Sequence, residues 1–576
     1  MYEIITKIYN GTTLVKYEVL DINTKRKHIL PVETVHGLAM AGALINAEFN
    51  LTQRQLTGKN DCDLRKLPKK QDYIKGTLTR GIECLTGKKL ADTAIEATKE
   101  TSAERYLVEE VMNYLHKPCN SKICALYGLR RTGKTVMMYH SILRLLNEGI
   151  ENVAFISLVE TSHLNVLYKK IDELMNQNIK YVFIDEITAV NGFIQSSALL
   201  ADKYAAAGVH IVIAGTDSYI IELASQNNLY DRLIKINTTY IGYKEYEHLN
   251  LGTGILDYIR IGGVLPADIF YNESKTKDYV NTAIVENIIN SLLRANNRKE
   301  HQRLLELEQR GLLRKAIEQA IEASNNELTT SVITQSYVNG TLGSAKQLME
   351  KIFNIDDTLD IEEVQDRVRY RLAIVKDFDI EINDDYAEEL RDYLEEIGVI
   401  KLYYRYRTKG KGIERVEVPL FIQSGLRYNQ TIALLNALCE TESFYDIPLD
   451  IRQQFKNKII EDVEGNLLEH EVLISDLMKY KDKNVEITQL NYKGKEIDMI
   501  VHEEKLLYLF EIKHSEKSVD SQAKWLVNKE LNDFIERYFC GTIKKRIVLY
   551  LGTDKMVDVD GKIVLYRKIE DFLKSI

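Results

Sequence analysis

Proline, cysteine and tryptophan are scarce in this chain of 576 residues, which has six prolines, six cysteines and one tryptophan. So few prolines, together with 45% apolar and 28% charged residues, exclude a collagen-like or largely disordered chain and indicate packed domains. The cysteines are scattered. The close pair Cys119 and Cys124 lacks the second pair that a zinc site needs, so we expect reduced thiols.

Long apolar runs and a strong excess of positive charge are also missing. No apolar run approaches the roughly 18 residues of a membrane-spanning helix, and the first residues lack the apolar core of a signal peptide. These absences predict a cytoplasmic protein without a membrane partner. The net charge of −9 excludes a polycation that coats nucleic acid, so any DNA contact must come from a local patch.

The length predicts three or four domains at about 150 residues each. We place a small α+β module of unknown role at residues 1–66. Its pattern predicts strands at 4–9 and 14–22, a helix at 31–43 and a short strand at 47–51. A polar, turn-rich segment with Pro68 follows, and the apolar spacing over 91–115 then predicts amphipathic helix.

The rest of the chain divides into three regions, with the core of the first at residues 100–250. Between 122 and 218, fully apolar β-rich runs alternate with helical patterns, which predicts an α/β fold with a parallel sheet covered on both faces. Residues 251–430 are mainly helical and end in a strand, a turn and a strand. Residues 431–576 alternate helix and strand again and predict a smaller α/β domain.

The run GLRRTGKT follows the apolar strand KICALY and precedes a helix. Its glycines let successive backbone N–H groups turn inward and hold phosphate oxygens at a helix N-terminus. Lys134 is placed to reach the β- and γ-phosphates of ATP, and the Thr135 hydroxyl to ligate Mg²⁺. The flanking strand and helix disfavour the alternative of an ordinary glycine-rich turn. The predicted nucleotide-binding residues are Gly128, Arg130, Arg131, Thr132, Gly133, Lys134, Thr135 and Thr216.

A second apolar strand, KYVFIDE, ends in Asp185 and Glu186. We predict that Asp185 holds Mg²⁺ and that Glu186 polarises the attacking water. One further strand, VAFISL, separates the two motifs in the chain, and with Glu186 it indicates the hydrolysing (ASCE) branch of P-loop NTPases. Thr216, at the tip of HIVIAG, is placed to sense the γ-phosphate. Arg232 is a candidate to stabilise the transferring phosphoryl group, in its own chain or in a neighbouring subunit of a homo-oligomer, and a solvated surface arginine is the alternative.

With these motifs the chain resembles AAA-type ATPases of bacteria and archaea in which a winged helix and a C-terminal restriction-endonuclease-like domain follow the ATPase. The resemblance covers about residues 100–576. It rests on GLRRTGKT, FIDEI, IAGTDS, the pair Asp231 and Arg232, and YIRIGGVLPA with Gly262, Gly263 and Pro266. The family usually has glycine at the position of Asp231 and a tighter spacing than GVLP. The resemblance implies a role near DNA maintenance or defence against mobile elements.

A basic hairpin, residues 399–422 around the turn TKGKG, looks like the wing of a winged helix. Cations on a projecting wing can track DNA phosphates while tyrosines stack, so residues 403–415 are a candidate DNA contact. The alternative is a solvated ribbon whose tyrosines cover the core. The side chains concerned are Arg405, Arg407, Lys409, Lys411, Arg415, Tyr403, Tyr404 and Tyr406.

The predicted catalytic residues of the last region are Glu469, Asp498, Glu511 and Lys513. Glu469 lies on a helix, Asp498 ends a strand, and Glu511 and Lys513 share a face of the next strand because side chains alternate. A hairpin turning near Glu503 and Glu504 would pair Asp498 with Glu511. Such a pair binds Mg²⁺ or Mn²⁺, while Lys513 positions or activates a water. This order is the signature of PD-(D/E)xK phosphodiesterases.

We therefore expect an ATP-hydrolysing protein whose nucleotide state controls how a nuclease-like domain acts on nucleic acid. Its expected cofactors are ATP and Mg²⁺, with a second divalent metal in the C-terminal domain. The alternative is a nucleotide-dependent switch whose C-terminal domain binds without cleaving. A third hypothesis is that the helical region 270–350 binds a protein client.

Overall fold

A computed structural model describes residues 2–10, 13–21, 26–31, 82–99, 103–265, 273–294, 301–314, 316–317, 384–410, 412–429, 432, 449–481 and 483–576. The chain divides into two compact units, Met1–Arg80 and Gly81–Ile576. The predicted strand at 47–51 lies outside the described residues, as do Pro68, Pro266, Lys411 and all but the first residue of the predicted helix at 31–43. Much of the region 270–350 also lies outside them.

Antiparallel strands form the described part of the first unit, in the order β1-β2-β3. The first two confirm the predicted strands. The third was not predicted, because its short apolar run between charged residues does not show a period. The bounds are β1 (Tyr2–Asn10), β2 (Thr13–Asp21) and β3 (Arg26–Pro31).

A six-stranded sheet begins the second unit, in the spatial order β4-β6-β7-β8-β5-β9. Strand β4 is an antiparallel edge strand, and the others are parallel to one another. The predicted strands are confirmed, and β4 and β9 are additional. The bounds are β4 (Ile82–Thr86), β5 (Ile123–Tyr127), β6 (Val153–Leu158), β7 (Tyr181–Asp185), β8 (His210–Gly215) and β9 (Leu233–Asn237).

Strand β8 lies between β5 and β7, the two strands that lead into the predicted nucleotide motifs. Strand β6, which separates these motifs in the sequence, lies beyond β7 instead. Parallel strands end at the same edge of a sheet, and ligands bind outside their carboxyl ends. The residues that follow β5, β7 and β8 therefore converge at one edge.

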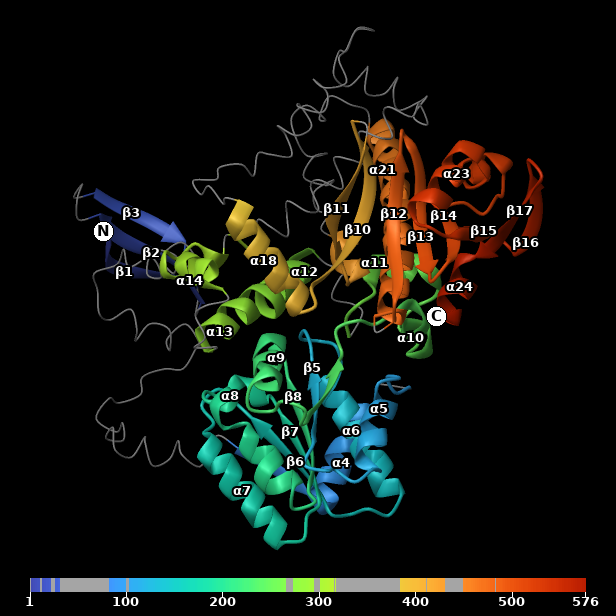
Figure 1. Ribbon diagram of the computed structural model, residues 1–576. Coiled ribbons are helices and arrows are strands. Elements are labelled where there is room, and N and C mark those ends of the chain that lie inside the picture. The colour runs from blue at the N-terminus through green and yellow to red at the C-terminus, as the bar shows by residue number, and fades with distance from the viewer. Residues whose placement is uncertain are drawn as a thin grey trace. The chain divides into compact units, whose positions relative to one another are not determined.

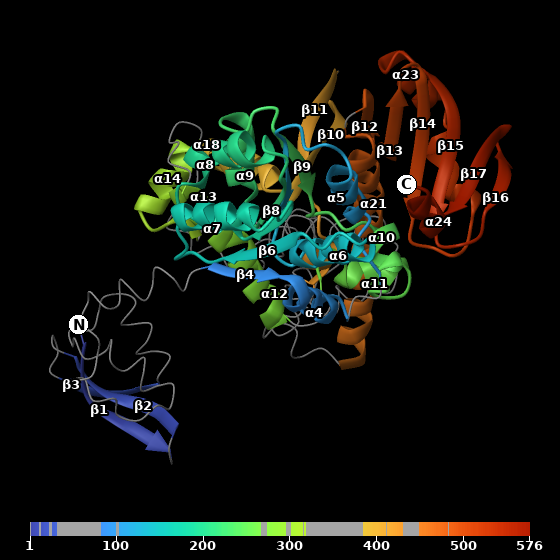
Figure 2. The same ribbon diagram turned by 90° about the horizontal axis from the view of Figure 1, so that it is seen from below.

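Helices cover both faces of this sheet (Figures 1 and 2). The side chains of β5 show why, because Ile123, Ala125 and Tyr127 join one apolar cluster while Cys124 and Leu126 join another. One face is covered by α7 (Leu164–Asn176), α8 (Phe193–Ser196), the π-helical segment η3 (Leu200–Ala205) and α9 (Ser218–Gln226), and a short 3₁₀ turn, η2 (Ile187–Ala189), follows β7. The other face is covered by α4 (Gly87–Thr98), α5 (Val108–Leu115) and α6 (Lys134–Asn147).

The amphipathic stretch predicted over 91–115 is thus two helices, α4 and α5. Between them the chain leaves the helix at a segment that carries Arg105, whose side chain is buried under the sheet edge rather than exposed. The run TKETSAERY at 98–106 is mostly polar, so the apolar spacing that predicts helix is interrupted where the two helices separate.

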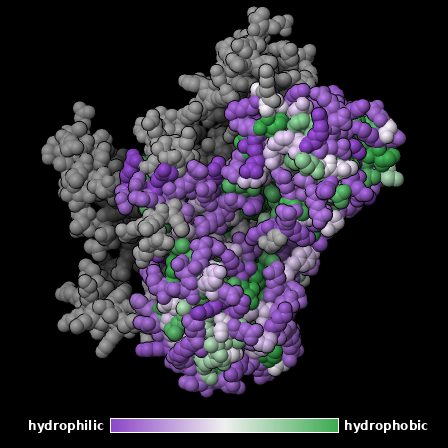
Figure 3. Space-filling view, in the orientation of Figure 1, coloured by the Kyte–Doolittle hydropathy of each residue, from purple (hydrophilic) through white to green (hydrophobic). Residues whose placement is uncertain are grey.

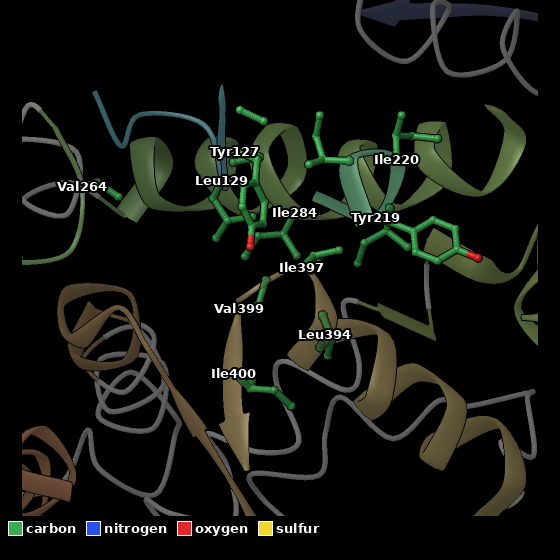
Figure 4. Packing of buried hydrophobic residues seen from close by; sticks show 14 of the residues in the cluster. Tyr127, Leu129, Tyr219, Ile220, Val264, Ile284, Leu394, Ile397, Val399 and Ile400 are labelled. Atoms are coloured by element: carbon green, nitrogen blue, oxygen red, sulfur yellow. The ribbon is translucent and has the colours of Figure 1, made fainter. Parts of the chain in front are cut away.

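Helices follow the sheet along the chain, as predicted. They are α10 (Tyr243–His248), α11 (Gly254–Ile261), α12 (Glu273–Tyr279), the π-helical segment η5 (Val280–Val285), α13 (Glu286–Arg294), α14 (Gln302–Gln309) and α18 (Asp384–Glu396). In Figure 4, Tyr127 and Leu129 at the end of β5 lie close to Ile284 of η5 and to Ile397 and Val399, which follow α18. The apolar core is therefore continuous from the end of β5 to the strand that begins after Val399.

A second sheet has eight strands in the order β11-β10-β12-β13-β14-β15-β17-β16. Strands β10 and β11 form the predicted basic hairpin, and β12 to β14 and β15 are the predicted strands of the last region. The bounds are β10 (Ile400–Lys409), β11 (Gly412–Phe421), β12 (Val485–Tyr492), β13 (Lys495–Glu503), β14 (Leu506–Lys513), β15 (Thr542–Tyr550), β16 (Lys555–Val559) and β17 (Lys562–Lys568).

The basic hairpin does not project as a free wing. Strand β10 pairs in parallel with β12, from Tyr404 opposite Thr488 to Arg407 opposite Asn491. This pairing satisfies backbone N–H and C=O groups that a free edge would expose. The hairpin, predicted within 251–430, therefore shares a sheet with strands of 431–576.

Helices pack on this second sheet, among them the long α21, which also lies beside α11 (Figures 1 and 2). They are α21 (Leu449–Lys479), the 3₁₀ turn η7 (Asp520–Ala523), α22 (Lys524–Val527), α23 (Lys529–Tyr538) and α24 (Ile569–Ser575). Hydrophilic residues dominate the described surface in Figure 3, broken by small hydrophobic patches. Among the described helices, none combines the length and apolar character needed to cross a membrane.

Candidate functional site

The predicted phosphate loop connects β5 with α6. Its glycines have backbone angles that other residues rarely adopt, with φ of 141° at Gly128 and 84° at Gly133. A Cβ atom at Gly128 would lie 2.6 Å from Oγ1 of Thr239. Glycine at this position therefore lets the loop pack directly against the segment that follows β9.

Lys134, the first residue of α6, folds back over this loop. Its Nζ donates hydrogen bonds to the carbonyl oxygens of Gly128 at 2.9 Å and Leu129 at 2.7 Å. Burial lowers the pKa of Lys134 to about 8, against the opposing charges of Glu186 and Asp185. A phosphate beside the ammonium would raise this pKa again. The lysine is thus placed to meet an anion at the helix N-terminus.

Thr135 and Asp185 meet at the edge where the strands end. The Thr135 hydroxyl donates to Oδ2 of Asp185 at 2.7 Å, and Oδ1 accepts from the backbone N–H of Glu186 at 3.0 Å. Adjacent hydroxyl and carboxylate oxygens are the ligands that Mg²⁺ prefers. These two side chains therefore fit the predicted Mg²⁺.

Glu186 directly follows β7 in the left-handed conformation, with φ of 56°. Burial and then the charge of Asp185 raise the pKa of Glu186, while Lys134, Arg130 and a hydrogen bond with Thr216 oppose the shift. A carboxylate of raised pKa is a better proton acceptor near neutral pH. The structure thus brings Glu186 and Thr216 together beside Lys134.

The other predicted loop residues differ in their surroundings. Arg130 and Arg131 are exposed, and Arg131 has a positive φ of 63°. Thr132 is fully buried. Its hydroxyl donates to the carbonyl of Leu129 at 2.9 Å and lies 2.7 Å from Oγ1 of Thr238. Its side chain therefore holds the loop in shape, and only its backbone N–H is left to bind a phosphate.

A second cluster of charged residues lies where β13 and β14 pair. Their antiparallel register runs from Glu503 opposite Leu506 to Met499 opposite Phe510, so Asp498 and Glu511 follow as the next opposed residues. Nζ of Lys513 lies 3.0 Å from Oδ2 of Asp498 and 2.6 Å from Oε2 of Glu511. The structure thus brings these three predicted residues together.

More carboxylates surround this group. Glu469 approaches from α21, and Glu496 lies two residues before Asp498 on β13. Burial and then the charge of Asp498 raise the pKa values of Glu469, Glu496 and Glu511. Burial alone would lower the pKa of Lys513, but the neighbouring carboxylates raise it overall. Glu496 was not predicted, because a charged residue early in a strand is indistinguishable in sequence from a solvated one.

The cluster holds more carboxylates than cations. Oε1 of Glu511 is buried without a hydrogen-bond partner. In the part of the chain that the structure describes, no three or more His, Cys, Asp or Glu side chains are arranged as a metal site. The charge and the oxygen donors of this cluster suit a divalent cation. Its ligands would be Asp498 and Glu511, whose oxygens both contact the Lys513 ammonium.

Comparison with known proteins is consistent with the geometry of the first site. Residues 120–247 match the family model of an AAA domain. The matched stretch contains the phosphate loop, Asp185, Glu186 and Thr216, and it supports nucleotide binding and ATP hydrolysis by this part of the chain. No curated protein matches the sequence.

Among solved structures, the chain is similar to Hsp104. The S. cerevisiae Hsp104–casein complex in an extended conformation shares 14% identity over 38% of this chain and 42% of the Hsp104 chain, with a TM-score of 0.23. The S. cerevisiae Hsp104–ADP complex shares 11% identity over 70% of this chain and 55% of that chain, with a TM-score of 0.24. The match thus spans about half the length of these Hsp104 chains, and TM-scores this low do not extend the likeness to the whole fold.

Arg232 lies far from the predicted phosphate loop of the same chain. It precedes β9, and its carbonyl accepts a hydrogen bond from the N–H of Ile123, the first residue of β5. The loop follows the other end of β5, about 16 Å away at 3.3 Å per strand residue. The side chain forms an ion pair with Asp202. The structure therefore does not bring Arg232 to the nucleotide site within one chain.

Asp231, the residue before Arg232, stands where the family that the chain resembles usually has glycine. Asp231 has a φ of 55°, in the left-handed region that glycine adopts without cost. Aspartate is among the few other residues that tolerate this conformation. Asp231 therefore fits a left-handed position at which the family that the chain resembles usually has glycine.

The cations of the basic hairpin are largely engaged with neighbouring side chains. Arg407 and Lys409 both pair with Glu414, and the Arg415 guanidinium lies over the ring of Tyr404. Arg405 donates to Gln489 and to the hydroxyl of Tyr403. Tyr403 and Tyr406 are buried. These contacts favour the ribbon whose tyrosines cover the core, and DNA contact through this hairpin stays a prediction.

Two residues of α13 contact the loops at the sheet edge that carries the predicted phosphate loop. Nδ2 of Asn287 donates to the carbonyl of Thr216 at 3.0 Å, and Nη1 of Arg294 donates to the carbonyl of Thr188 at 3.2 Å. They are thus placed to hold the segments that follow β8 and β7. Sequence analysis missed both, because contacts across 71 and 106 residues leave no local pattern.

Proposed function

We propose that the protein hydrolyses ATP in its AAA domain and that the nucleotide state controls a nuclease-like C-terminal domain acting on nucleic acid. The ATPase half rests on the match of residues 120–247 and on the phosphate loop. The nuclease half goes beyond the comparisons. The observation that carries it is the contact of one lysine, Lys513, with two opposed carboxylates, Asp498 and Glu511.

In the ATP site, each side chain has a defined part. Lys134 binds the β- and γ-phosphates and offsets their charge, and the loop N–H groups at the start of α6 hold the oxygens. Thr135 and Asp185 would hold Mg²⁺, which would supply positive charge to offset that of the phosphates. Glu186 accepts a proton from the attacking water, and Thr216 orients this water. The position of β8 between β5 and β7 supports assignment to the ASCE branch.

In the C-terminal site, Asp498 and Glu511 would hold a divalent metal, Mg²⁺ or Mn²⁺. That metal would supply Lewis-acid polarisation of a phosphodiester and a water of lowered pKa. Glu469 supplies further negative charge from α21. Lys513 orients the attacking water and stabilises negative charge on the phosphate oxygens.

A cleavage assay tests this half of the proposal. Full-length protein is incubated with single- and double-stranded DNA and RNA, with Mn²⁺ or Mg²⁺, and with or without ATP. We expect metal-dependent cleavage that Asp498→Asn and Lys513→Ala abolish. Glu503→Gln, which changes an exposed carboxylate on the same strand, should cleave like the parent. Equal cleavage by all four proteins would contradict the assignment.

The second candidate is a nucleotide-dependent switch whose C-terminal domain binds nucleic acid without cleaving it. The ion pairs of Lys513 with both carboxylates favour it, because they neutralise part of the charge that would attract a metal. This candidate predicts nucleic-acid binding that depends on ATP but no cleavage with either metal. A filter-binding assay run beside the cleavage assay separates the two.

A further inference from the structure

A short connector, residues 238–240, lies along the phosphate loop after β9. Oγ1 of Thr239 accepts a hydrogen bond from the N–H of Leu129 at 3.2 Å, and Thr238 contacts Thr132 hydroxyl to hydroxyl at 2.7 Å. The backbone N–H of Thr238 donates to the carbonyl of Tyr127, where β5 ends. These hydrogen bonds join the loop to the connector, so a rearrangement that moves Leu129 or Thr132 disturbs them.

Arg105 forms hydrogen bonds with both the phosphate loop and the connector. Its buried guanidinium donates to the carbonyls of Thr132 and Thr238, both at 2.7 Å, and of Tyr240 at 2.9 Å. Glu245 neutralises the guanidinium with contacts at 3.0 and 2.7 Å. A planar, always charged guanidinium holds such a set of acceptors in a fixed geometry. The loop and the connector thus form one bonded unit.

The connector also reaches α21. The hydroxyl of Tyr240 donates to Oε1 of Glu471 at 3.0 Å and lies 2.8 Å from the hydroxyl of Ser475. Glu471 is two residues from Glu469, and two residues turn a helix by about 200°. One face of α21 therefore contacts the connector, and the opposite face presents Glu469 to Asp498 and Glu511.

We propose that Tyr240 couples the phosphate loop to α21, so that ATP binding alters the stability of the helix that carries Glu469. This inference rests on the proposed function. The driving step is local, because Lys134 must leave the carbonyls of Gly128 and Leu129 to reach the phosphates of ATP. Leu129 is the residue whose N–H bonds to the connector, so its rearrangement is passed to Tyr240 and then to Glu471.

Hydrogen exchange measured by mass spectrometry tests the coupling in the full chain. Exchange of peptides covering 464–476 is followed with and without a non-hydrolysable ATP analogue and Mg²⁺, and analogue binding is measured separately with a fluorescent nucleotide. In the parent, the analogue should change the exchange rate of this part of α21. In Tyr240→Phe, which removes only the hydroxyl, the analogue should still bind while the response of α21 is lost.

Tyr168→Phe is the matched control, because it removes a hydroxyl that bonds to the Ser196 carbonyl inside the AAA domain. It should respond like the parent. Ser475→Ala approaches the same contact from α21 and should also weaken the response, which keeps the test valid if Tyr240→Phe folds poorly. The coupling is overturned if α21 does not respond in the parent although the analogue binds, or if Tyr240→Phe responds fully. Failure of the analogue to bind would instead overturn the ATPase proposal, and with it this inference.

A double-mutant cycle gives a second readout. By thermodynamic linkage, a change on α21 that alters the coupling alters nucleotide affinity by the same factor. Glu471→Leu, which removes the acceptor of the Tyr240 hydroxyl, should therefore shift the dissociation constant of the nucleotide by about fivefold or more in the parent, within the range of allosteric couplings. In the Tyr240→Phe background the shift should vanish. Equal shifts in both backgrounds would mean that Tyr240 does not connect the two sites.

Discussion

At the scale of single residues, Glu186 offers the sharpest test of the ATP site. Glu186→Gln keeps the shape of the side chain but removes its ability to accept a proton. We expect ATP to bind as in the parent and hydrolysis to slow by about 10²-fold or more, the usual contribution of a general base. Single-turnover hydrolysis and nucleotide binding measure the two effects. Lys134→Ala should instead lose binding, and loss of affinity in Glu186→Gln would make Glu186 a structural residue.

Glu471 predicts a pH dependence at the same scale. Burial raises its pKa from 4.5 to about 8, against hydrogen bonds from Tyr240, Tyr258 and Ser475. The folded chain favours the neutral carboxyl of Glu471, so this carboxyl adds to the free energy of unfolding. The contribution is full below pH 4.5 and is lost as the pH rises through 8.

Melting curves between pH 5 and 9 measure this effect. Glu471→Gln stays neutral throughout, so the parent should lose stability relative to the variant as the pH rises, by about 1.4 kcal/mol for each unit of pKa shift. Glu503→Gln, at an exposed carboxylate, should follow the parent. Curves of parent and Glu471→Gln that stay parallel would show that Glu471 is ionised in the folded protein.

At the scale of elements, the opposed strands β13 and β14 predict a response to metal. Lys513 offsets only part of the negative charge of the surrounding carboxylates, so Mn²⁺ should bind and stabilise the fold by about 2.7 kcal/mol at a hundredfold excess over its dissociation constant. Asp498→Asn should lose most of this gain. Melting curves of nucleotide-free protein against Mn²⁺ concentration provide the measurement.

The full chain is the right sample for that experiment. A fragment of residues 430–576 would lack β10. The backbone groups of β12 that pair with β10 would then be unpaired. Thr135 and Asp185 also offer ligands to a metal, but they are unchanged in the parent and in Asp498→Asn. The difference between the two proteins therefore reports the C-terminal site, and an equal response would remove the carboxylates from the proposal.

At the scale of the whole molecule, Arg232 predicts a shared site between chains. The structure places it at the end of β5 remote from its own phosphate loop, so any contact with nucleotide must be with a neighbour. Mixing Arg232→Ala with Glu186→Gln should then restore part of the ATPase activity, because the second variant supplies an intact Arg232 to an intact Glu186 of the first. The steady-state rate of the mixture is compared with those of the separate variants.

Sedimentation of the same mixture shows whether the chains associate. Activity that equals the average of the two variants, in a mixture that does form oligomers, would leave Arg232 as a surface residue paired with Asp202. Normal ATPase activity of Arg232→Ala alone would also show that Arg232 is a surface residue without a part in hydrolysis.

The sequence by itself determined the features that depend on local order. The phosphate loop needs glycines, a lysine and a threonine at fixed spacing, and the buried parallel strands need unbroken apolar runs, so both are visible in single segments. The β13–β14 hairpin belongs here too, because strand alternation and a turn at Glu504 are enough to oppose Asp498 and Glu511.

Only the tertiary structure decided which distant segments meet. The pairing of β10 with β12 turned a predicted wing into part of the C-terminal sheet, and the place of β8 between β5 and β7 is a matter of strand order in space. The contacts of Tyr240 with Glu471 span 231 residues. Such contacts depend on how whole elements pack against each other, and no spacing along the chain records that packing.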